Sequence, residues 1–367
     1  MSEAETLTEA RRVMTLCNAC RYCEGFCAVF PAMELRTAFT DDDLRYLSNL
    51  CHDCRGCYYA CQYAPPHAFD VNVPRVFAEL RLHSYTRFAR PRWLGRWLRR
   101  PVVGAWLAGA LAFVGILAVV GLGPGLRALT VPHVGAGAFY AVVPYSALVG
   151  SAGLLLLAVA MAWLAATRAA GWLSRSGGSA GLLRAAIDAA RLTYLGGGGE
   201  GCPYPEERPS ARRRLFHQLV VWGFLLDLAA TSVAALYHHV LHREAPYALT
   251  SLPVLLGSLG GAGLMVGCLG LLALRRHADR DPAFPAARRL DAQLLWLLLL
   301  TVASGFGVLF LRETAALGPS LVLHLTCVGA LFLTTPYGKL IHALHRFAAL
   351  ARWAGERARH TAHCDAP

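Results

Sequence analysis

Charged side chains are scarce in this sequence. Only 16% of its 367 residues are Asp, Glu, Lys or Arg, whereas 56% are hydrophobic. A chain this apolar is unlike an ordinary soluble enzyme. The net charge of +12 is no sign of nucleic-acid binding, because the arginines lie between hydrophobic runs and not on one basic face or tail. The composition therefore predicts a membrane protein with a small soluble part and no nucleic-acid partner.

Several functional motifs are also missing. Residues 1–16 lack the basic segment, apolar segment and cleavage site of a signal peptide, so we expect the N-terminus to stay on the side where it is made. The sequence has no flavin-binding motif, no arrangement of nucleophile and base, and no soluble domain of a size that suits an organic substrate. We therefore expect no catalytic residue and no oxidation of an organic substrate by this chain alone.

Cysteine, in contrast, is concentrated near the N-terminus. The spacing C-x2-C-x2-C-x3-C occurs twice between residues 17 and 61. In two-cluster ferredoxins, three thiolates of such a run bind one [4Fe–4S] cube and the fourth reaches the other cube. The spacing predicts one cluster on Cys17, Cys20, Cys23 and Cys61, and a second on Cys51, Cys54, Cys57 and Cys27. Structural zinc would leave half of these cysteines without a role, and disulfides require an oxidising compartment.

The residues around the cysteines predict a helical head. Thr40, followed by Asp41, Asp42 and Asp43, is typical of a helix start and predicts a short helix through Leu50. This insert favours a helical ferredoxin-like domain over residues 1–80. Residues 81–100 mix arginines with Phe and Trp, which is typical of an interfacial connector that contacts membrane lipid. We expect a mainly α-helical chain in which residues 101–350 form a transmembrane domain and residues 351–367 a cytoplasmic tail.

Six stretches reach the ~20 apolar residues that a helix needs to cross a bilayer. They are 101–123, 141–167, 215–241, 251–274, 292–312 and 321–345. Arginines crowd the segment before the first span and every second gap after it, whereas the other gaps contain only Arg127, Arg243 and Arg312. By the positive-inside rule, we predict a multi-pass protein of the bacterial inner membrane with the head and both termini in the cytoplasm.

Histidines at the ends of two spans indicate haem. His217 and His238 lie near the inner and outer ends of the third span, and His342 and His324 near the inner and outer ends of the sixth. In a continuous sixth helix, His324 and His342 are about five turns apart and share one face. Because the two spans run in opposite directions, we predict two b-type haems, one on His217 and His342 and one on His238 and His324. Rival ligands near the membrane boundaries are His239, His242 and His345.

The sequence leaves two interpretations open for the glycine-rich loop and two for Asp227. The glycines at 196, 198 and 201 match G-x-G-x-x-G, but a helical segment precedes them and Pro203 follows, so a dinucleotide site is not expected. This loop is a flexible linker, or a docking or quinone-adjacent loop that exposes Cys202 to a partner. Asp227, in the middle of the third span, is a functional carboxylate near a quinone or a structural hydrogen-bonding group.

Four segments together resemble a known family. They are the doubled cysteine run, the loop YLGGGGEGCPYPEERPS, the span FHQLVVWGFLLDLAATSVAALYHH and the closing HLTCVGALFLTTPYGKLIHALHR. Over residues 15–355 the chain resembles the tricarballylate-utilisation protein B (CitB) family, and it is similar to the C-terminal half of the ring-contracting flavoprotein of cobalamin synthesis. The resemblance implies an iron–sulfur and b-haem membrane protein that reoxidises the FADH2 of a partner dehydrogenase, such as tricarballylate dehydrogenase, and passes electrons to quinone. Carried over by motif, its ligands are the eight cysteines and His217, His238, His324 and His342.

The sequence therefore predicts an electron-transfer component rather than a complete enzyme. Its expected cofactors are two [4Fe–4S] clusters and two haems b, with quinone as the acceptor. The expected partners are an FAD-dependent dehydrogenase and membrane lipid. The alternatives are a membrane sensor of redox or iron status, a role in corrin ring contraction, and a transporter with a regulatory metal head.

Overall fold

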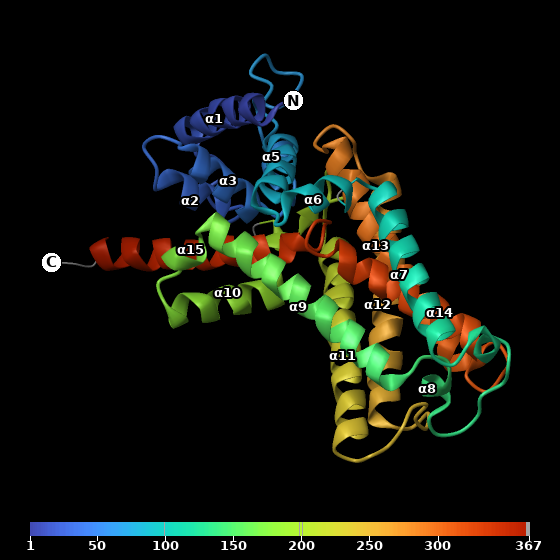
Figure 1. The fold of residues 1–367 in the computed structure, drawn as a ribbon. Helices are drawn as coiled ribbons and strands as arrows, with labels where there is room; N and C mark the ends of the chain where they lie inside the picture. Colours follow the sequence, from blue (N-terminus) through green and yellow to red (C-terminus); the bar gives the residue numbers. More distant parts are fainter. Residues whose placement is uncertain (99, 198, 200, 365–367) are drawn as a thin grey trace.

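The structure is a computed structural model that describes the chain except residues 99, 198, 200 and 365–367. A compact group of short helices at one end is the head, and a bundle of long helices extends from it (Figure 1). The C-terminal helix lies between the two and runs beneath the head (Figure 1). The mainly helical fold expected from the sequence is confirmed.

The head consists of five helices packed around one hydrophobic core. They are α1 (Glu3–Cys20), α2 (Val29–Glu34), α3 (Asp41–Leu50), α4 (Gly56–Tyr59) and α5 (Val73–Phe88). Helix α3 begins at a capping box in which the Thr40 side chain accepts from the Asp43 amide and the Asp43 side chain accepts from the Thr40 amide. The predicted short helix is therefore confirmed. Fully buried side chains of several head helices, including Met14, Phe30, Leu47 and Phe77, form the core.

The connector and the long helices follow. Helix α6 (Arg92–Leu98) exposes Trp93 and Trp97, as an interfacial segment would. Six helices are long and apolar enough to cross a membrane. They are α7 (Val103–Leu122), α9 (Tyr145–Ala170), α11 (Arg212–His239), α12 (Leu252–His277), α13 (Pro285–Leu311) and α14 (Leu317–Thr334). Large apolar side chains such as Leu111, Leu154 and Phe310 stay exposed on the outside of the bundle, which suits contact with lipid.

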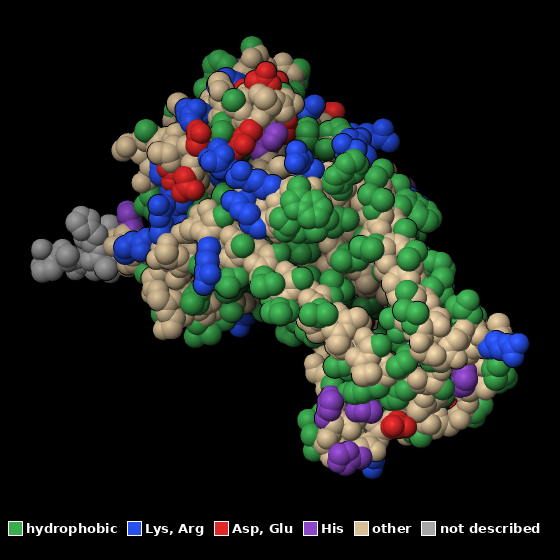
Figure 2. Space-filling model, viewed as in Figure 1, with side chains coloured by type: hydrophobic (Ala, Val, Ile, Leu, Met, Phe, Trp, Pro, Cys, Tyr) green, Lys and Arg blue, Asp and Glu red, His purple; other side chains and the backbone are tan. Residues whose placement is uncertain are grey.

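Short elements connect these helices. They are η1 (Leu126–Leu129), α8 (Ala138–Val142), η2 (Leu173–Arg175), α10 (Ser179–Arg191), η3 (Thr193–Gly196) and the antiparallel pair β1 (Cys202–Pro203) and β2 (Pro209–Ser210). Lys and Arg gather around the head and the C-terminal helix, whereas hydrophobic side chains dominate the visible face of the bundle (Figure 2).

The sixth span differs from its prediction as one helix over 321–345. Helix α14 ends at Thr334, and α15 begins at Ile341 and continues to Cys364. Pro336 explains the break, because proline has no amide hydrogen and its ring clashes with the carbonyl four residues earlier in a continuing helix. His342 therefore lies on α15, and the expectation that it shares a face of one helix with His324 is wrong.

The segment expected as a tail, 351–367, is helical as far as Cys364. Residues 348–351 and Trp353 belong to the hydrophobic core of the head, together with Trp172 and the end of α9. The head is thus joined to the rest of the molecule by a shared core as well as by the connector.

Candidate functional site

The eight cysteines fall into two spatial groups. Burial, together with the nearby thiols Cys23, Cys61 and Cys20, raises the pKa of the Cys17 thiol to about 12. Burial likewise raises the pKa of Cys27 well above its usual value, and electrostatic interaction with Cys54 and Cys51 also raises it. The fourth cysteine of each run therefore lies among the thiols of the other run. The structure brings together the two sets that the spacing predicts.

The chain leaves space at the first group and bends sharply at the second. A cavity of about 270 Å³ is lined by Cys17, Cys20, Cys23, Cys57 and Cys61, among other residues. Between the cysteines of the second run, left-handed backbone at Asp53 and Arg55 turns the chain back on itself. The Asp53 amide donates to Cys51 Sγ at 3.4 Å. In the part of the chain that the structure describes, no three His, Cys, Asp or Glu side chains lie close enough to hold a single metal ion.

Two arginines hold the second group against α5 and α15. Arg346 Nη2 of α15 donates to the Cys51 carbonyl at 2.7 Å, and Arg81 Nη1 of α5 donates to the same oxygen at 3.1 Å. Arg81 also donates to the Ser48 carbonyl at 2.9 Å. Two guanidinium groups thus converge on the backbone of one predicted cluster ligand.

The glycine-rich loop packs against the same group. Cys202 is fully buried, and its Sγ donates to the Cys54 carbonyl at 2.8 Å. The interpretation that this loop exposes Cys202 to a partner is therefore wrong. The guanidinium groups of Arg55 and Arg213 both contact the Tyr204 ring, at 4.7 Å and 4.5 Å from its centroid.

The glycines of this loop serve its tight fold. Gly201 has φ of +113°, and a Cβ there would lie 2.9 Å from the Ser210 amide nitrogen. Gly198 of the G-x-G-x-x-G match lies outside the described residues. The turn η3 precedes the loop and the two-residue strand β1 follows it, which is unlike the βαβ unit of a dinucleotide site.

The two histidines of the predicted inner haem, His217 and His342, lie close together. The ring centroids of His217 on α11 and His342 on α15 are 6.4 Å apart, with the rings nearly perpendicular. His342 Nδ1 lies 2.6 Å from the Lys339 carbonyl oxygen, which leaves Nε2 as the ring nitrogen available to a ligand. Burial lowers the pKa of His342 well below its usual value, and the charges of Lys339 and Arg346 lower it further. The imidazole is therefore neutral, as a metal ligand must be.

The outer histidines occupy two separate environments. His324 Nδ1 lies 3.2 Å from Ser304 Oγ and 3.2 Å from the Thr301 carbonyl, both on α13. A Cβ at Gly305 would lie 3.2 Å from the His324 ring, so glycine leaves room for the imidazole. The His238 ring stacks on Tyr145 at 3.7 Å. Among the described residues no ring contact joins His238 to His324, so the structure does not bring this second pair together as it does the first.

The rival ligands are engaged in other ways. His239 Nε2 lies 2.7 Å from the Tyr145 hydroxyl. His345 is buried with neither ring nitrogen hydrogen-bonded among the described residues, and its ring stacks on Tyr85 at 5.7 Å. His242 has left-handed backbone just beyond the end of α11.

Asp227 lies on the seam between α11 and α12. A Cβ at Gly260 would lie 2.5 Å from Asp227 Oδ1 and 2.8 Å from the Gly223 carbonyl. Glycines on both helices therefore allow the backbones to approach closely, as small residues do in membrane helices. This contact is local packing and keeps both interpretations of Asp227 open.

His52 and Arg346 were not singled out from the sequence. His52 follows Cys51 directly, is buried, and its ring centroid lies 5.8 Å from that of Tyr194. Burial and the charge of Arg346 lower the pKa of His52 well below its usual value. Adjacency to a cysteine ligand was the available signal for His52, and a place one helical turn after His342 was the signal for Arg346.

Comparisons with known proteins agree with this two-part arrangement. A family model described as citrate utilization protein B matches residues 96–363, and one described as its Fer4-like domain matches residues 10–87. A curated Escherichia coli protein named citrate utilization protein B is 43% identical over 364 residues, which cover 97% of this chain and 95% of the relative. The chain belongs to the citrate utilization protein B family. No solved structure matches it.

Membership in the citrate utilization protein B family confirms the resemblance seen in the sequence. The Fer4-like match includes both cysteine runs, which indicates iron–sulfur binding and electron transfer. The second match begins within α6 and includes all six membrane-spanning candidates.

Proposed function

We propose that this protein carries electrons from a partner FAD-dependent dehydrogenase, of the tricarballylate dehydrogenase type, to quinone in the bacterial inner membrane. When bound, two [4Fe–4S] clusters and b-type haems supply one-electron transfer along this route. The observation that carries the proposal is the junction at Arg346. This residue donates to the carbonyl of cluster ligand Cys51 and lies one helical turn from His342, which meets His217.

The cysteines suit clusters better than zinc. In a tetrahedral zinc site with Zn–S of ≈ 2.3 Å, neighbouring sulfurs stand ~3.8 Å apart. A [4Fe–4S] cube holds its four thiolates farther apart, at its corners. Cysteines of both runs line a cavity at the first group, and the fourth cysteine of each run lies among thiols of the other run. Both observations support a cube in each group.

The inner histidine pair would suit a haem. Two imidazoles could hold one haem only if their rings lie close together, and the haem would then supply one-electron transfer. The His217–His342 centroid separation of 6.4 Å agrees with this. The carbonyl of Lys339 orients His342 through Nδ1, as outer partners of ligating histidines do. His238 and His324 remain the proposed pair for the second haem.

The distribution of charge supports the proposed topology. On the visible face, Lys and Arg gather over the head and the helices next to it, whereas the far end of the bundle shows few of them (Figure 2). By the positive-inside rule, the head faces the cytoplasm, where a soluble dehydrogenase can reach it. Both termini lie on the same side in this arrangement.

An optical spectrum of the purified chain tests the haem part of the proposal. A dithionite-reduced minus oxidised spectrum should show a b-type α band. His217→Ala and His342→Ala should each remove the same component of the band, and the double variant should remove no more. The exposed His277 provides a control, because His277→Ala should leave the band intact. Separate components lost in the two single variants would contradict a shared haem.

A reconstituted assay tests the electron route. Reduced tricarballylate dehydrogenase should be reoxidised by quinone only when the wild-type protein is present in the membrane. Cys20→Ala should abolish this reaction while the b-type α band persists. A Cys20→Ala variant that works at the wild-type rate would contradict the role of the first cluster. A protein with both cofactors but no quinone-linked flavin oxidation would instead favour a sensor.

A further inference from the structure

A large basic cleft lies beside the second cysteine group. Its volume is about 990 Å³, and its lining includes Cys27 and, from the turn before it, Arg21, Glu24, Gly25 and Phe26. The other walls come from Arg191, Thr193, Tyr194 and Gly199, from the start of α11 and from the C-terminal part of α15. Segments far apart in the sequence thus form one opening that reaches a predicted cluster ligand.

Charge is distributed unevenly in this cleft. Its lining holds four arginines against two glutamates, namely Arg21, Arg191, Arg214 and Arg357 against Glu24 and Glu34. Glu24 and Arg21 both act electrostatically on Glu34, so these three lie together on the head side. Among the described residues, none of the ion pairs involves Arg191, Arg214 or Arg357. The opposite wall therefore presents uncompensated positive charge.

Two arginines of this wall, Arg214 and Arg357, are held in place by neutral groups. The Arg214 guanidinium donates to the Arg191 carbonyl at 2.8 Å and 3.2 Å. The Arg357 guanidinium lies 5.9 Å from the Trp353 ring centroid, and Trp353 Nε1 donates to the Tyr194 hydroxyl at 3.3 Å. These contacts position the guanidinium groups without neutralising them. A positively charged surface next to the predicted cluster ligand Cys27 is complementary to an electron donor with an acidic surface.

We propose that this cleft is the docking site for the acidic surface of the flavoprotein donor. This inference rests on the proposed function and adds to it the place where the partner binds. Complementary charge speeds association and fixes the orientation of the two proteins. Binding here brings the donor against the turn between Cys20 and Cys27, next to ligands of both clusters. The acidic residues of the donor pair with Arg191, Arg214 and Arg357.

Charge reversal within the cleft tests this site. The double variant Arg191→Glu with Arg357→Glu reverses two arginines of the basic wall, and neither side chain forms a described hydrogen bond. The matched control is Arg208→Glu with Arg280→Glu, which makes the same charge change at exposed positions outside the lining. Each full-length protein is placed in nanodiscs, and binding of purified tricarballylate dehydrogenase is measured at low and high salt.

The cleft variant should weaken binding about tenfold or more at low salt, and the difference should shrink at high salt. The control should bind like wild type. Dithionite reduction and the optical spectrum should be the same in all three proteins, which shows that the fold is intact. Equal binding by both variants, or no binding by wild type, would overturn the docking site. Binding of free FAD to wild type that is lost only in the cleft variant would also overturn it, because the cleft would then be a nucleotide site.

This experiment separates the two proposals. Binding that follows the predicted pattern without any electron transfer to quinone would support the docking site and defeat the proposed function. Electron transfer at the wild-type rate in the cleft variant, with unchanged binding, would support the function and defeat the docking site.

Discussion

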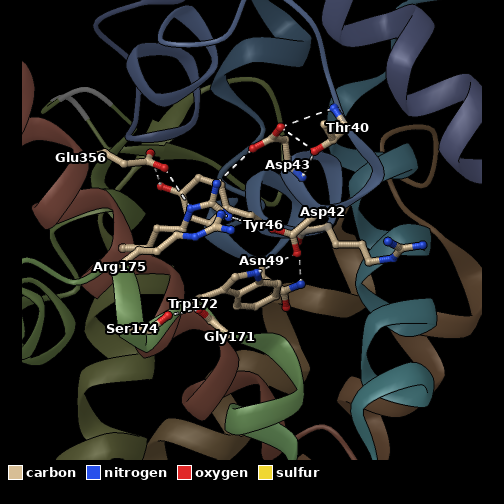
Figure 3. A network of polar contacts seen from close by, with 12 residues as sticks. Thr40, Asp42, Asp43, Tyr46, Asn49, Gly171, Trp172, Ser174, Arg175 and Glu356 are labelled. Carbon is tan, nitrogen blue, oxygen red and sulfur yellow. Dashed lines mark hydrogen bonds and ion pairs between the residues drawn. The ribbon is translucent and has the colours of Figure 1, made fainter.

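Arg352 of α15 holds this helix against the head through Asp42 and Asp43, and it also pairs with Glu356 of its own helix. Its side chain is 3% exposed and contacts Asp42 at 3.2 Å, Asp43 at 3.0 Å and Glu356 at 2.9 Å. Its guanidinium also lies 4.0 Å from the centroid of the Tyr46 ring. Figure 3 shows the acidic residues of the head facing Glu356 across this network. We predict that Arg352→Gln loosens the head without removing any cofactor ligand.

The size of the effect follows from the burial of each contact. Removing one partner of a buried ion pair costs about 3–5 kcal/mol, because the remaining charge is left without compensation. Arg36 also pairs with Asp43 at 2.8 Å and with Glu356 at 2.6 Å, so both carboxylates keep one partner. Asp42 is half-exposed and adds little. Arg352→Gln should therefore lower the free energy of separating α3 from α15 by about 3 kcal/mol, near the low end of this range. This corresponds to a roughly hundredfold increase in the population in which the two helices are apart.

Hydrogen exchange measures this opening directly. When opening is fast and reversible, the exchange rates of α3 amides follow the population of the opened state. These rates should rise about a hundredfold in Arg352→Gln. The control is Arg11→Gln, whose ion pair with Asp41 is exposed, and its effect on α3 should be small. Unchanged exchange in Arg352→Gln, or an equal change in both variants, would refute the reasoning.

Three further predictions concern single contacts. Cys202→Ala should lower the free energy of unfolding by about 1 kcal/mol, because the Cys54 carbonyl loses a buried donor, and Cys202→Ser should restore most of it, as thermal unfolding can measure. Gly260→Ala should cost about 1–3 kcal/mol, because its Cβ would meet Asp227 and the α11 backbone, whereas Gly109→Ala on α7 meets nothing within 4 Å and should not destabilise. Burial favours a higher pKa for Asp43, but hydrogen bonds from Thr40 and Arg36 and the charges of Arg36 and Arg352 hold it below its usual 3.8. Its stabilising contribution is thus complete above that pH and is lost as the pH falls through the lowered pKa, so α3 exchange should accelerate in acid in wild type and not in Asp43→Asn.

The features that the sequence predicted well depend on local or strongly periodic signals. The capping box at Thr40 defines α3, and the long apolar runs define the six membrane-spanning candidates. The grouping of Cys27 with Cys51 and Cys54 follows from a spacing that allows little else. The meeting of His217 and His342 follows from opposite chain directions, which survive the break before α15.

The features that were missed depend on tertiary contacts or on one residue within an apolar run. The prediction of one helix over 321–345 ran through Pro336, because apolar residues resume at Leu340 and Ile341. The glycine-rich loop has little hydrophobic sequence, and nothing in its pattern shows that Cys202 lies under the second cysteine run. The role of Arg346 depends on a carbonyl almost 300 positions earlier in the chain, which no local pattern encodes.

The break at Pro336 explains how one helix performs three tasks. If the sixth span continued to residue 345, His342 would lie on a membrane helix whose direction is set by lipid and by its neighbours. Because α15 starts afresh at Ile341, its direction is set by the head core through residues 348–351 and by Arg352 through the acidic residues of α3. His342, Arg346 and Arg352 then follow one another along a single rigid element. A displacement of the head would therefore move α15 with it, and the Cys51 carbonyl and His342 would keep their separation.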